Sequence, residues 1–407
     1  MIYYTNKHIQ HFHLNILFRD NLDCDYKRNM LKRIILILLL GLTIISCTPP
    51  VSSNIEIDNY IKNNYQTPEE YVISKFSDHD YVFIGEQHRI KHDVNFISNL
   101  IPRLYKNGIM NLAIEFGASS NQSLLDSLLS MDQWDQDFAY QIASKGYYIS
   151  WGYKEYLDIL KKAWELNQTL EEGRPKFRII YLNTDYFPYE KGKAIYGGIE
   201  PDLNMSNTLQ KEVIGKNEKA LIYTGINHAF TRFNQIMYDS ENTETFKLYD
   251  ERFGNLIHKI YPERTFTIFL HAPWASKKRE SSKAVKPAKG VIDACMASFN
   301  NKPVGFNVTG TPFGALSSND SFYCIGHDHF TLADFCDGYI FLKPYSQFEK
   351  VSVADGFYTG NRLNEIRDFY KGLGLSAKKV DNWSQEAIEY AISKDGDFVL
   401  KTANRLK

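Results

Sequence analysis

Short apolar segments alternate with amphipathic segments along most of the chain. Seven apolar segments of five to seven residues, rich in β-branched and aromatic side chains, predict strands at 81–85, 111–116, 177–183, 220–225, 265–270, 304–308 and 338–343. Such nearly continuous apolarity is typical of strands that are covered on both faces, as in a parallel sheet.

Amphipathic helices are predicted between these strands. The segment after the first strand repeats apolar residues at spacings of four and three, which defines one helical face: Ile90, Val94, Ile97, Ile101 and Leu104. Further helices are predicted at 153–168, 246–261 and 360–372. This alternation predicts an α/β fold with a mainly parallel sheet flanked by helices.

Residues 118–152 interrupt the alternation. They contain helical fragments and end within an aromatic-rich stretch, "KGYYISWGYKEYL". The sequence therefore predicts a helical insertion that caps the carboxyl end of the strands, within a single α/β domain over residues 66–407.

The amino end has the pattern of a secretory leader. Lys32 and Arg33 precede an apolar run at 34–45, which is shorter than the roughly 20 residues needed to cross a bilayer. Residues 44–47 resemble a bacterial lipobox, which implies a diacylated Cys47. We expect residues 1–46 to be a non-mature leader, with translation starting at Met30 and a signal peptide at about 30–46. Residues 47–65 would then form a tether.

Lipidation of Cys47 would place the protein at the bacterial cell envelope, on the outer membrane or the cell surface. The alternative interpretation of the same segment is an uncleaved anchor helix.

The net charge of the chain bears on the kind of partner that it binds. The chain has 47 basic and 48 acidic residues, and residues 1–46 hold six and three of these, which leaves 41 and 45 and a net charge of −4. There is no basic excess to favour nucleic-acid binding. Cys295, Cys324 and Cys336 do not have zinc-site spacing, and both free thiols and a Cys324–Cys336 disulfide remain open.

Polar residues recur where the predicted strands end. In a parallel sheet these ends lie at one edge, where ligands bind. The residues concerned, in strand order, are Glu86 and His88; Glu115; Asn183 and Asp185; Asn227, His228 and Arg232; His271; and Asn307 and Thr309. The repetition predicts a functional site at this edge of the sheet.

Single residues of this set differ in what they indicate. Glu115 lies inside an apolar strand, where an unpaired carboxylate is costly to bury, so it needs a partner. Glu86 and His88 are two apart in an extended segment and share a side, although a surface turn would have the same pattern. His271 fits a core histidine as well as a site residue, and His92 is expected to be exposed. The run His327, Asp328 and His329 is metal-like, but its role stays open.

Four motifs together resemble the erythromycin esterase/ChaN-like superfamily: "FIGEQH", "AIEF", "NTD" and "YTGINHAFTRF". The resemblance covers about residues 78–345, and its spacing favours the branch of ChaN-like haem-binding lipoproteins. Erythromycin esterases usually have Thr-His-Gly after the first Glu, whereas Gln87 and Arg89 flank the histidine here. By position, the resemblance implies a catalytic site that contains Glu86, His88, Glu115, His228 and Arg232. It also implies a cofactor-binding aromatic segment with Trp151, Tyr153 and Tyr156.

Three functions remain open on this basis. The first is a hydrolase of a small-molecule ligand, in which histidine next to carboxylate supplies a base near neutral pH. In that case Glu86, His88, Glu115 and His228 could equally hold a divalent metal. The second is a haem- or iron-binding lipoprotein without catalytic activity, in which the aromatic insertion covers a flat ligand. The third is a structural lipoprotein.

Overall fold

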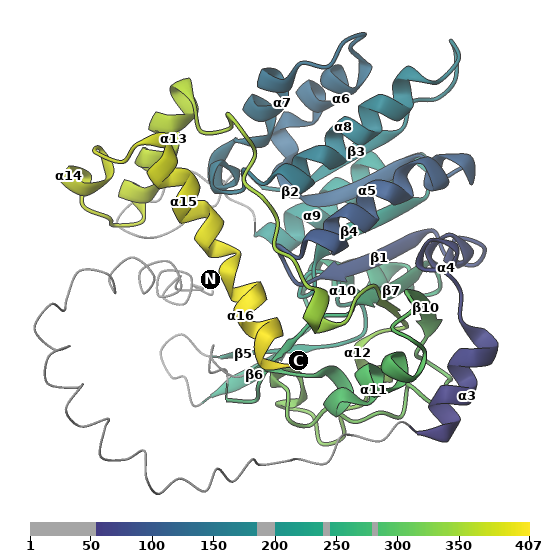
Figure 1. Cartoon of the computed structure of the whole chain (residues 1–407). Helices are drawn as coiled ribbons and strands as arrows, with labels where there is room; N and C mark the ends of the chain where they lie inside the picture. The colour runs from purple at the N-terminus through teal and green to yellow at the C-terminus, as the bar shows by residue number, and fades with distance from the viewer. Residues whose placement is uncertain (1–53, 185–199, 239–244, 279–283) are drawn as a thin grey trace, which may run out of the picture. The chain divides into compact units, whose positions relative to one another are not determined.

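The computed structural model describes residues 54–184, 200–238, 245–278 and 284–407. All seven predicted strands form one sheet in the order β10-β11-β7-β1-β4-β2-β3 (Figure 1). Their bounds are β1 Tyr81–Glu86, β2 Asn111–Ala118, β3 Arg178–Asn183, β4 Ala220–Gly225, β7 Thr265–Leu270, β10 Val304–Asn307 and β11 Gly338–Phe341. Every neighbouring pair is parallel except β10 and β11. The predicted α/β fold with a mainly parallel sheet is confirmed.

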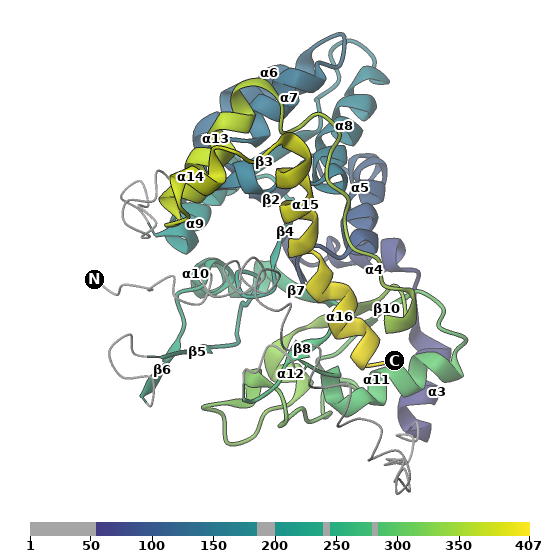
Figure 2. The same cartoon turned by 60° about the vertical axis from the view of Figure 1, so that its left-hand side comes forward.

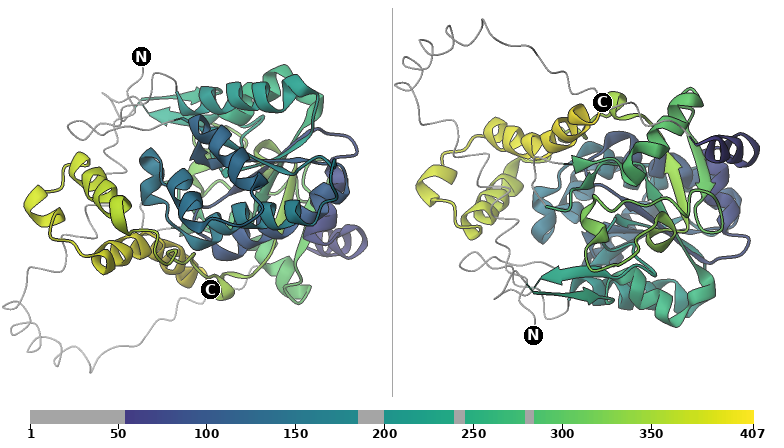
Figure 3. Two further views of the ribbon diagram at one scale, coloured as in Figure 1. Left: turned by 90° about the horizontal axis from the view of Figure 1, so that it is seen from above. Right: turned by 90° about the horizontal axis from the view of Figure 1, so that it is seen from below.

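Helices cover both faces of the sheet (Figure 3). Along β1, Val82 and Ile84 pack into the core on one face, whereas Tyr81 and Phe83 pack into the core on the other. The first core includes residues of α5 (Lys91–Lys106), α6 (Gln122–Ser130), α7 (Gln136–Ala143) and α8 (Lys154–Gln168). The second includes residues of α3 (Ile55–Asn64), α9 (Pro201–Glu212), α10 (Phe253–Ile260), α11 (Val291–Ser298) and α12 (Leu332–Phe335). Burial on both faces explains why the strands are apolar throughout.

Two smaller antiparallel pairs accompany the main sheet. They are β5 (Gln235–Tyr238) with β6 (Phe246–Tyr249), and β8 (Trp274–Ala275) with β9 (Ala284–Val285). The helix predicted at 246–261 was therefore wrong in its first half. Phe246 and Leu248 alternate with more polar neighbours, a period of two that suits a strand, and the helix begins only at Phe253.

The insertion predicted at 118–152 contains α6, α7 and two short 3₁₀ turns, η1 (Ser119–Asn121) and η2 (Gly146–Ser150). α6 lies along the edge strand β3. There the Gln122 side chain donates to the Ile179 carbonyl and accepts from the Tyr181 N–H, each at 2.9 Å. One amide thus replaces a missing strand neighbour. η2 reaches the carboxyl end of β2, where the Tyr148 hydroxyl donates to the Glu115 carbonyl at 2.6 Å.

The C-terminal helices also lie at the carboxyl ends of the strands (Figure 2). They are α13 (Gly360–Gly372), α14 (Ala377–Val380), α15 (Gln385–Asp395) and α16 (Asp397–Arg405). Val399 and Ala403 of α16 share a small apolar cluster with Ile90 and Ala272, which lie four and two residues after the ends of β1 and β7. Only the first of these helices was predicted.

At the amino end of the described residues, α3 is followed by α4 (Pro68–Lys75). Within the described part of the chain, no helix combines the length and apolarity required to cross a bilayer. The predicted leader, Cys47 and residues 47–53 of the predicted tether lie outside the described residues.

Candidate functional site

Four predicted site residues come together at the carboxyl ends of three adjacent strands. Glu86 ends β1, Glu115 lies near the end of β2, and His228 follows β4, the strand between them. His88 follows Glu86 directly after β1. The parallel register of β1 with β4, and of β4 with β2, places these ends together.

Glu86 is a buried carboxylate that positions His88. It is 1% exposed, and its two oxygens accept the hydroxyls of Tyr156, at 2.5 Å, and of Tyr223. His88 Nδ1 lies 2.8 Å from Glu86 Oε1. Burial raises the pKa of Glu86, and the neighbouring His88 opposes this rise. With Nδ1 held by Glu86, the imidazole of His88 has its Nε2 left for chemistry.

His228 is held in a similar way by Asp202, a residue that the sequence did not indicate. His228 Nδ1 lies 2.6 Å from Asp202 Oδ1, which also accepts the Phe253 N–H at 2.8 Å. Arg252 Nη1 lies 3.2 Å from the other oxygen. Burial alone would raise the pKa of Asp202, but His228 and Arg252 lower it to about 2. Burial lowers the pKa of His228, yet the carboxylates of Asp202 and Glu115 outweigh this effect and the net pKa is raised.

Glu115 lies beside His228 and the backbone of Gly225. Its Oε2 accepts the Gly225 N–H at 2.7 Å, and its Oε1 lies 3.5 Å from His228 Nε2. A Cβ added to Gly225 would stand 2.8 Å from His88 Nε2 and 3.3 Å from Glu115 Oε2. Hence both imidazoles have Nδ1 held by a buried carboxylate, and both direct Nε2 to the neighbourhood of Glu115.

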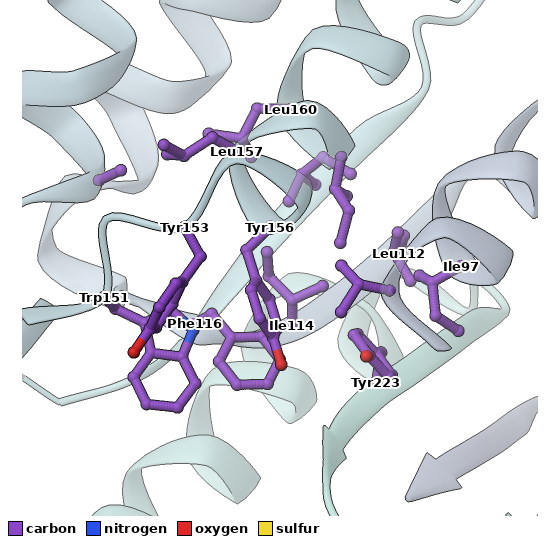
Figure 4. Packing of buried hydrophobic residues seen from close by; sticks show 14 of the residues in the cluster. Ile97, Leu112, Ile114, Phe116, Trp151, Tyr153, Tyr156, Leu157, Leu160 and Tyr223 are labelled. Carbon is purple, nitrogen blue, oxygen red and sulfur yellow. The ribbon is translucent and has the colours of Figure 1, made fainter. Parts of the chain in front are cut away.

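An aromatic cluster supports this arrangement. The His88 ring packs edge-on against Phe116 and Trp151, at centroid distances of 5.6 and 5.3 Å. Trp151, Tyr153 and Tyr156, predicted to bind a cofactor, lie beside Phe116 in the core (Figure 4) and are 8, 0 and 4% exposed. Tyr153 accepts from Arg89 Nε and donates to the carbonyl of Ile392. Tyr156 is engaged by Glu86 and the Arg89 N–H. These side chains serve the packing around His88, and a flat ligand would not reach Tyr153.

Arg232 does not join the site. After His228 the chain turns back across β7, where the Thr231 and Thr267 hydroxyls are 2.7 Å apart. Arg232 pairs with Asp337, just before β11, at 2.5 Å and donates to Thr309 at 3.1 Å. Because β10 is antiparallel to its neighbour, Asn307 and Thr309 at its end lie at the amino end of the parallel strands. The prediction that placed them with Glu86 assumed one direction for all strands.

His271 and His92 are buried. His271 is 2% exposed, stacks on Tyr345 with centroids 4.7 Å apart, and has its Nδ1 3.0 Å from the Tyr339 hydroxyl. His92, expected to be exposed, is 9% exposed and packs on Phe348. Burial lowers the pKa of His92 to about 3. The expectation was wrong because the first turn of α5 is covered by the loop around Phe348.

The remaining candidates lie apart from Glu86. His327 Nε2 lies 3.0 Å from the Asn234 carbonyl, and its ring stacks on Phe233. Asn183 uses its side chain to accept the Thr184 N–H, and Asp185 lies outside the described residues. Cys295, Cys324 and Cys336 are buried free thiols, so no Cys324–Cys336 disulfide is formed.

The four residues proposed as metal ligands do not form a matching donor set. Both oxygens of Glu86 accept tyrosine hydroxyls, and Nδ1 of each histidine is held by a carboxylate. This leaves two Nε2 atoms and one oxygen of Glu115. Across the described residues, no group of three or more His, Cys, Asp or Glu is arranged to hold a metal ion.

The sequence did not point to Asp202 or Arg252, because neither follows a predicted strand. Asp202 lies in the first turn of α9, and Arg252 is the residue before α10. An acidic residue in a first turn is ordinarily explained by the helix dipole. Only the fold, which packs α9 beside α10, brings the two to His228.

Comparison with known proteins gives remote likenesses. No protein-family model and no curated protein matches the chain. Solved structures similar to it include a succinoglycan biosynthesis protein, with 8% identity, a TM-score of 0.46 and coverage of 73% of this chain and 98% of that one. A Bacillus cereus protein has 10% identity, a TM-score of 0.41 and coverage of 74% and 98%. Haem-binding ChaN of Campylobacter jejuni has 15% identity, a TM-score of 0.28 and coverage of 49% and 85%.

Proposed function

We propose that the protein is a hydrolase in which His88, His228 and Glu115 carry out general acid–base catalysis. The observation that carries the proposal is the paired geometry of the two imidazoles around Glu115. A carboxylate that binds Nδ1–H fixes the tautomer and orientation of a histidine, so that Nε2 exchanges the proton. Two such histidines around one carboxylate suit a reaction that needs both a base and an acid.

The roles follow from charge and exposure. His228, whose pKa is raised, is the acid, and its Nε2 gives a proton to the leaving group. His88, with its side chain 30% exposed, accepts the proton of the attacking water at Nε2. Glu115, held by the Gly225 N–H, orients that water and stabilises the imidazolium of His228. Asp202 and Glu86 position the two histidines, and the proton lost by water is balanced by the proton given to the leaving group.

The motif resemblance supports the same residues, since it selects Glu86, His88, Glu115 and His228. On these motifs we also propose membership of the erythromycin esterase/ChaN-like superfamily. Anchoring of the chain to the bacterial envelope through acylated Cys47 is part of the proposal. Labelled palmitate should enter the wild-type protein but not Cys47→Ser, and equal labelling of both would contradict the anchor.

Haem binding is the weaker alternative. A haem protein needs an accessible axial ligand and a flat apolar face. His88 is accessible, but the hydroxyls of Tyr153 and Tyr156 are already bonded within the core.

One experiment separates the two functions. The purified protein is tested on a panel of chromogenic esters and amides, and a parallel sample is titrated with haemin. We expect turnover that falls by at least about a hundredfold in Glu115→Gln and His228→Gln, the lower range for a lost acid–base group. His79→Gln, at a histidine remote from the site, should keep full turnover. A saturable haemin Soret band without turnover on any panel member would overturn the proposal.

A further inference from the structure

A second feature at the carboxyl end of β2 is a cavity that none of the proposed catalytic residues lines. Its volume is about 860 Å³, within the range of small-molecule sites. Its walls come from η1, α6, α7 and η2 on one side and from α13, along its whole length, on the other. We refer to it as the α13 cavity.

The basic groups in its wall are already bonded to the protein. Arg362 donates to the carbonyl of Phe357 at 2.6 Å and pairs with Asp137 at 2.8 Å. Lys145 donates to the Ser120 hydroxyl at 2.8 Å. An anionic ligand would have to compete with these partners, so the α13 cavity is poorly suited to phosphate or carboxylate groups.

Three other polar groups in the wall are available. Gln141, Asn361 and Glu365 are exposed, and within the described residues their side chains have no hydrogen-bond or ion-pair partner. Two amides and one carboxylate offer both donors and acceptors in planar groups. Phe369 adds an aromatic ring to the same wall. Planar polar side chains beside an aromatic ring match a ligand that alternates hydroxyl groups with C–H faces.

The cavity is connected to the site through η2. The Phe369 ring packs against Tyr147 of η2 with centroids 5.9 Å apart. The Tyr147 ring also packs edge-on against the ring of Tyr148, with centroids 5.9 Å apart. The next residue, Tyr148, donates to the Glu115 carbonyl. Phe369 of the cavity wall is thus connected through Tyr147 and Tyr148 to the backbone of Glu115.

We propose that the α13 cavity binds a neutral, polyhydroxylated ligand of the oligosaccharide class. The idea that the cavity holds the substrate for cleavage rests on the proposed hydrolase function. The idea that the cavity binds such a ligand does not depend on that function. An extended peptide fits less well, because the wall is helical and offers no strand edge for backbone pairing.

The test measures binding rather than turnover. Maltohexaose and chitohexaose are titrated calorimetrically into the full-length protein carrying Glu115→Gln, which removes the proposed catalytic carboxylate but no cavity side chain. We expect saturable binding of at least one sugar. Asn361→Leu and Gln141→Leu should each weaken it about tenfold, as expected for one lost hydrogen bond. Asn364→Leu, on the same helix but outside the cavity wall, is the matched control and should bind as before.

The other outcomes overturn the proposal. They are no sugar binding at millimolar concentration, binding that Asn361→Leu and Gln141→Leu leave unchanged, or preferential binding of spermidine, inorganic phosphate or a neutral Gly-Ser peptide. Sugar binding without hydrolysis by the wild-type protein would contradict the catalytic role and leave the binding site intact. Hydrolysis of esters without sugar binding would support the catalytic role and contradict the proposed binding site.

Discussion

Some contacts at the site join residues close in sequence, whereas others join residues that only the fold brings together. Glu86 and His88 form a pair within three residues, so their contact was predictable from the sequence. The pairing of His228 with Asp202 spans 26 residues and depends on the packing of α9. Glu115 needed a partner because it lies in an apolar strand, and its partners are the Gly225 N–H and His228. The type of residue was predictable, whereas the identity of its partner was not.

Gly225 gives a direct test of the close approach of His88 to the end of β4. In Gly225→Ala the new Cβ would stand 2.5 Å from His88 Cε1, so the imidazole must leave its position against Gly225. We expect turnover to fall about a hundredfold, as for loss of an acid–base group. At Gly396 an added Cβ comes no closer to a neighbour than 3.2 Å, the distance to Lys350 Cδ, so Gly396→Ala is the control. Steady-state kinetics on the best panel substrate measures both, and unchanged turnover in Gly225→Ala would contradict the geometry.

Asp202 makes a pH-dependent contribution to stability. Its folded pKa, about 2, lies below its ordinary value of 3.8, so the stabilisation is present above pH 3.8 and is lost as pH falls toward 2. Nearly two pKa units correspond to about 2 kcal/mol. We expect Asp202→Asn to lower the free energy of unfolding by about that amount at pH 6 and by much less near pH 2. Urea denaturation at both values measures the difference, and an equal loss at both would refute the linkage.

The same substitution changes the titration of His228. The raised pKa of His228 means that its imidazolium stabilises the fold below its ordinary pKa of 6.5, and this effect is lost as pH rises through the raised value. Without the Asp202 charge, burial should lower the pKa of His228. NMR titration of the His228 ring Cε1–H in wild type and Asp202→Asn measures the shift, and His79 in the same spectra is the internal reference.

At the scale of elements, apolar runs and their spacing predicted the seven strands of the sheet. The direction of β10 was not predictable, because Val304 to Asn307 has the same apolar pattern in either direction. α14–α16 were missed since their buried residues are sparse, such as Ile388 and Ile392 in α15 and Val399 and Ala403 in α16. Such helices are stabilised mainly by the surface on which they dock, and that surface is formed by distant segments.

α6 protects the edge of the sheet through one side chain. Gln122 satisfies the Ile179 carbonyl and the Tyr181 N–H, which would otherwise face an unpaired edge. Gln122→Ala should reduce the free energy of unfolding by about 1–3 kcal/mol, the cost of unsatisfied buried groups, and should increase aggregation. Gln168→Ala, which removes a single bond to the Met131 carbonyl, is the milder control. Chemical denaturation and light scattering measure the two effects, and equal behaviour of both variants would contradict edge protection.

Across the whole described domain, the C-terminal helices contact residues that pack around the site. Ile392 of α15 accepts the hydroxyl of Tyr153, which in turn binds Arg89, the residue after His88. Arg89 has a φ of 71°, a left-handed conformation that is uncommon for a residue with a side chain. Its Trp151 and Tyr153 contacts maintain that conformation. We therefore expect the site to need α15 docked, together with α16, which follows it after Gly396.

Undocking α16 should disable the site without unfolding the sheet. In Val399→Asp combined with Ala403→Asp, two unpaired carboxylates would replace apolar contacts with Ile90 and Ala272, a cost that favours release of the helix. We expect hydrogen exchange to accelerate in α15, α16 and the segment around Arg89, while β1 and β4 stay protected. Turnover should fall with it, because Tyr153 loses the Ile392 carbonyl. Lys401→Asp with Asn404→Asp, on the exposed side of the same helix, should leave exchange and turnover unchanged. Full protection of α16 in the first variant, or full turnover despite its release, would show that the site does not need this support.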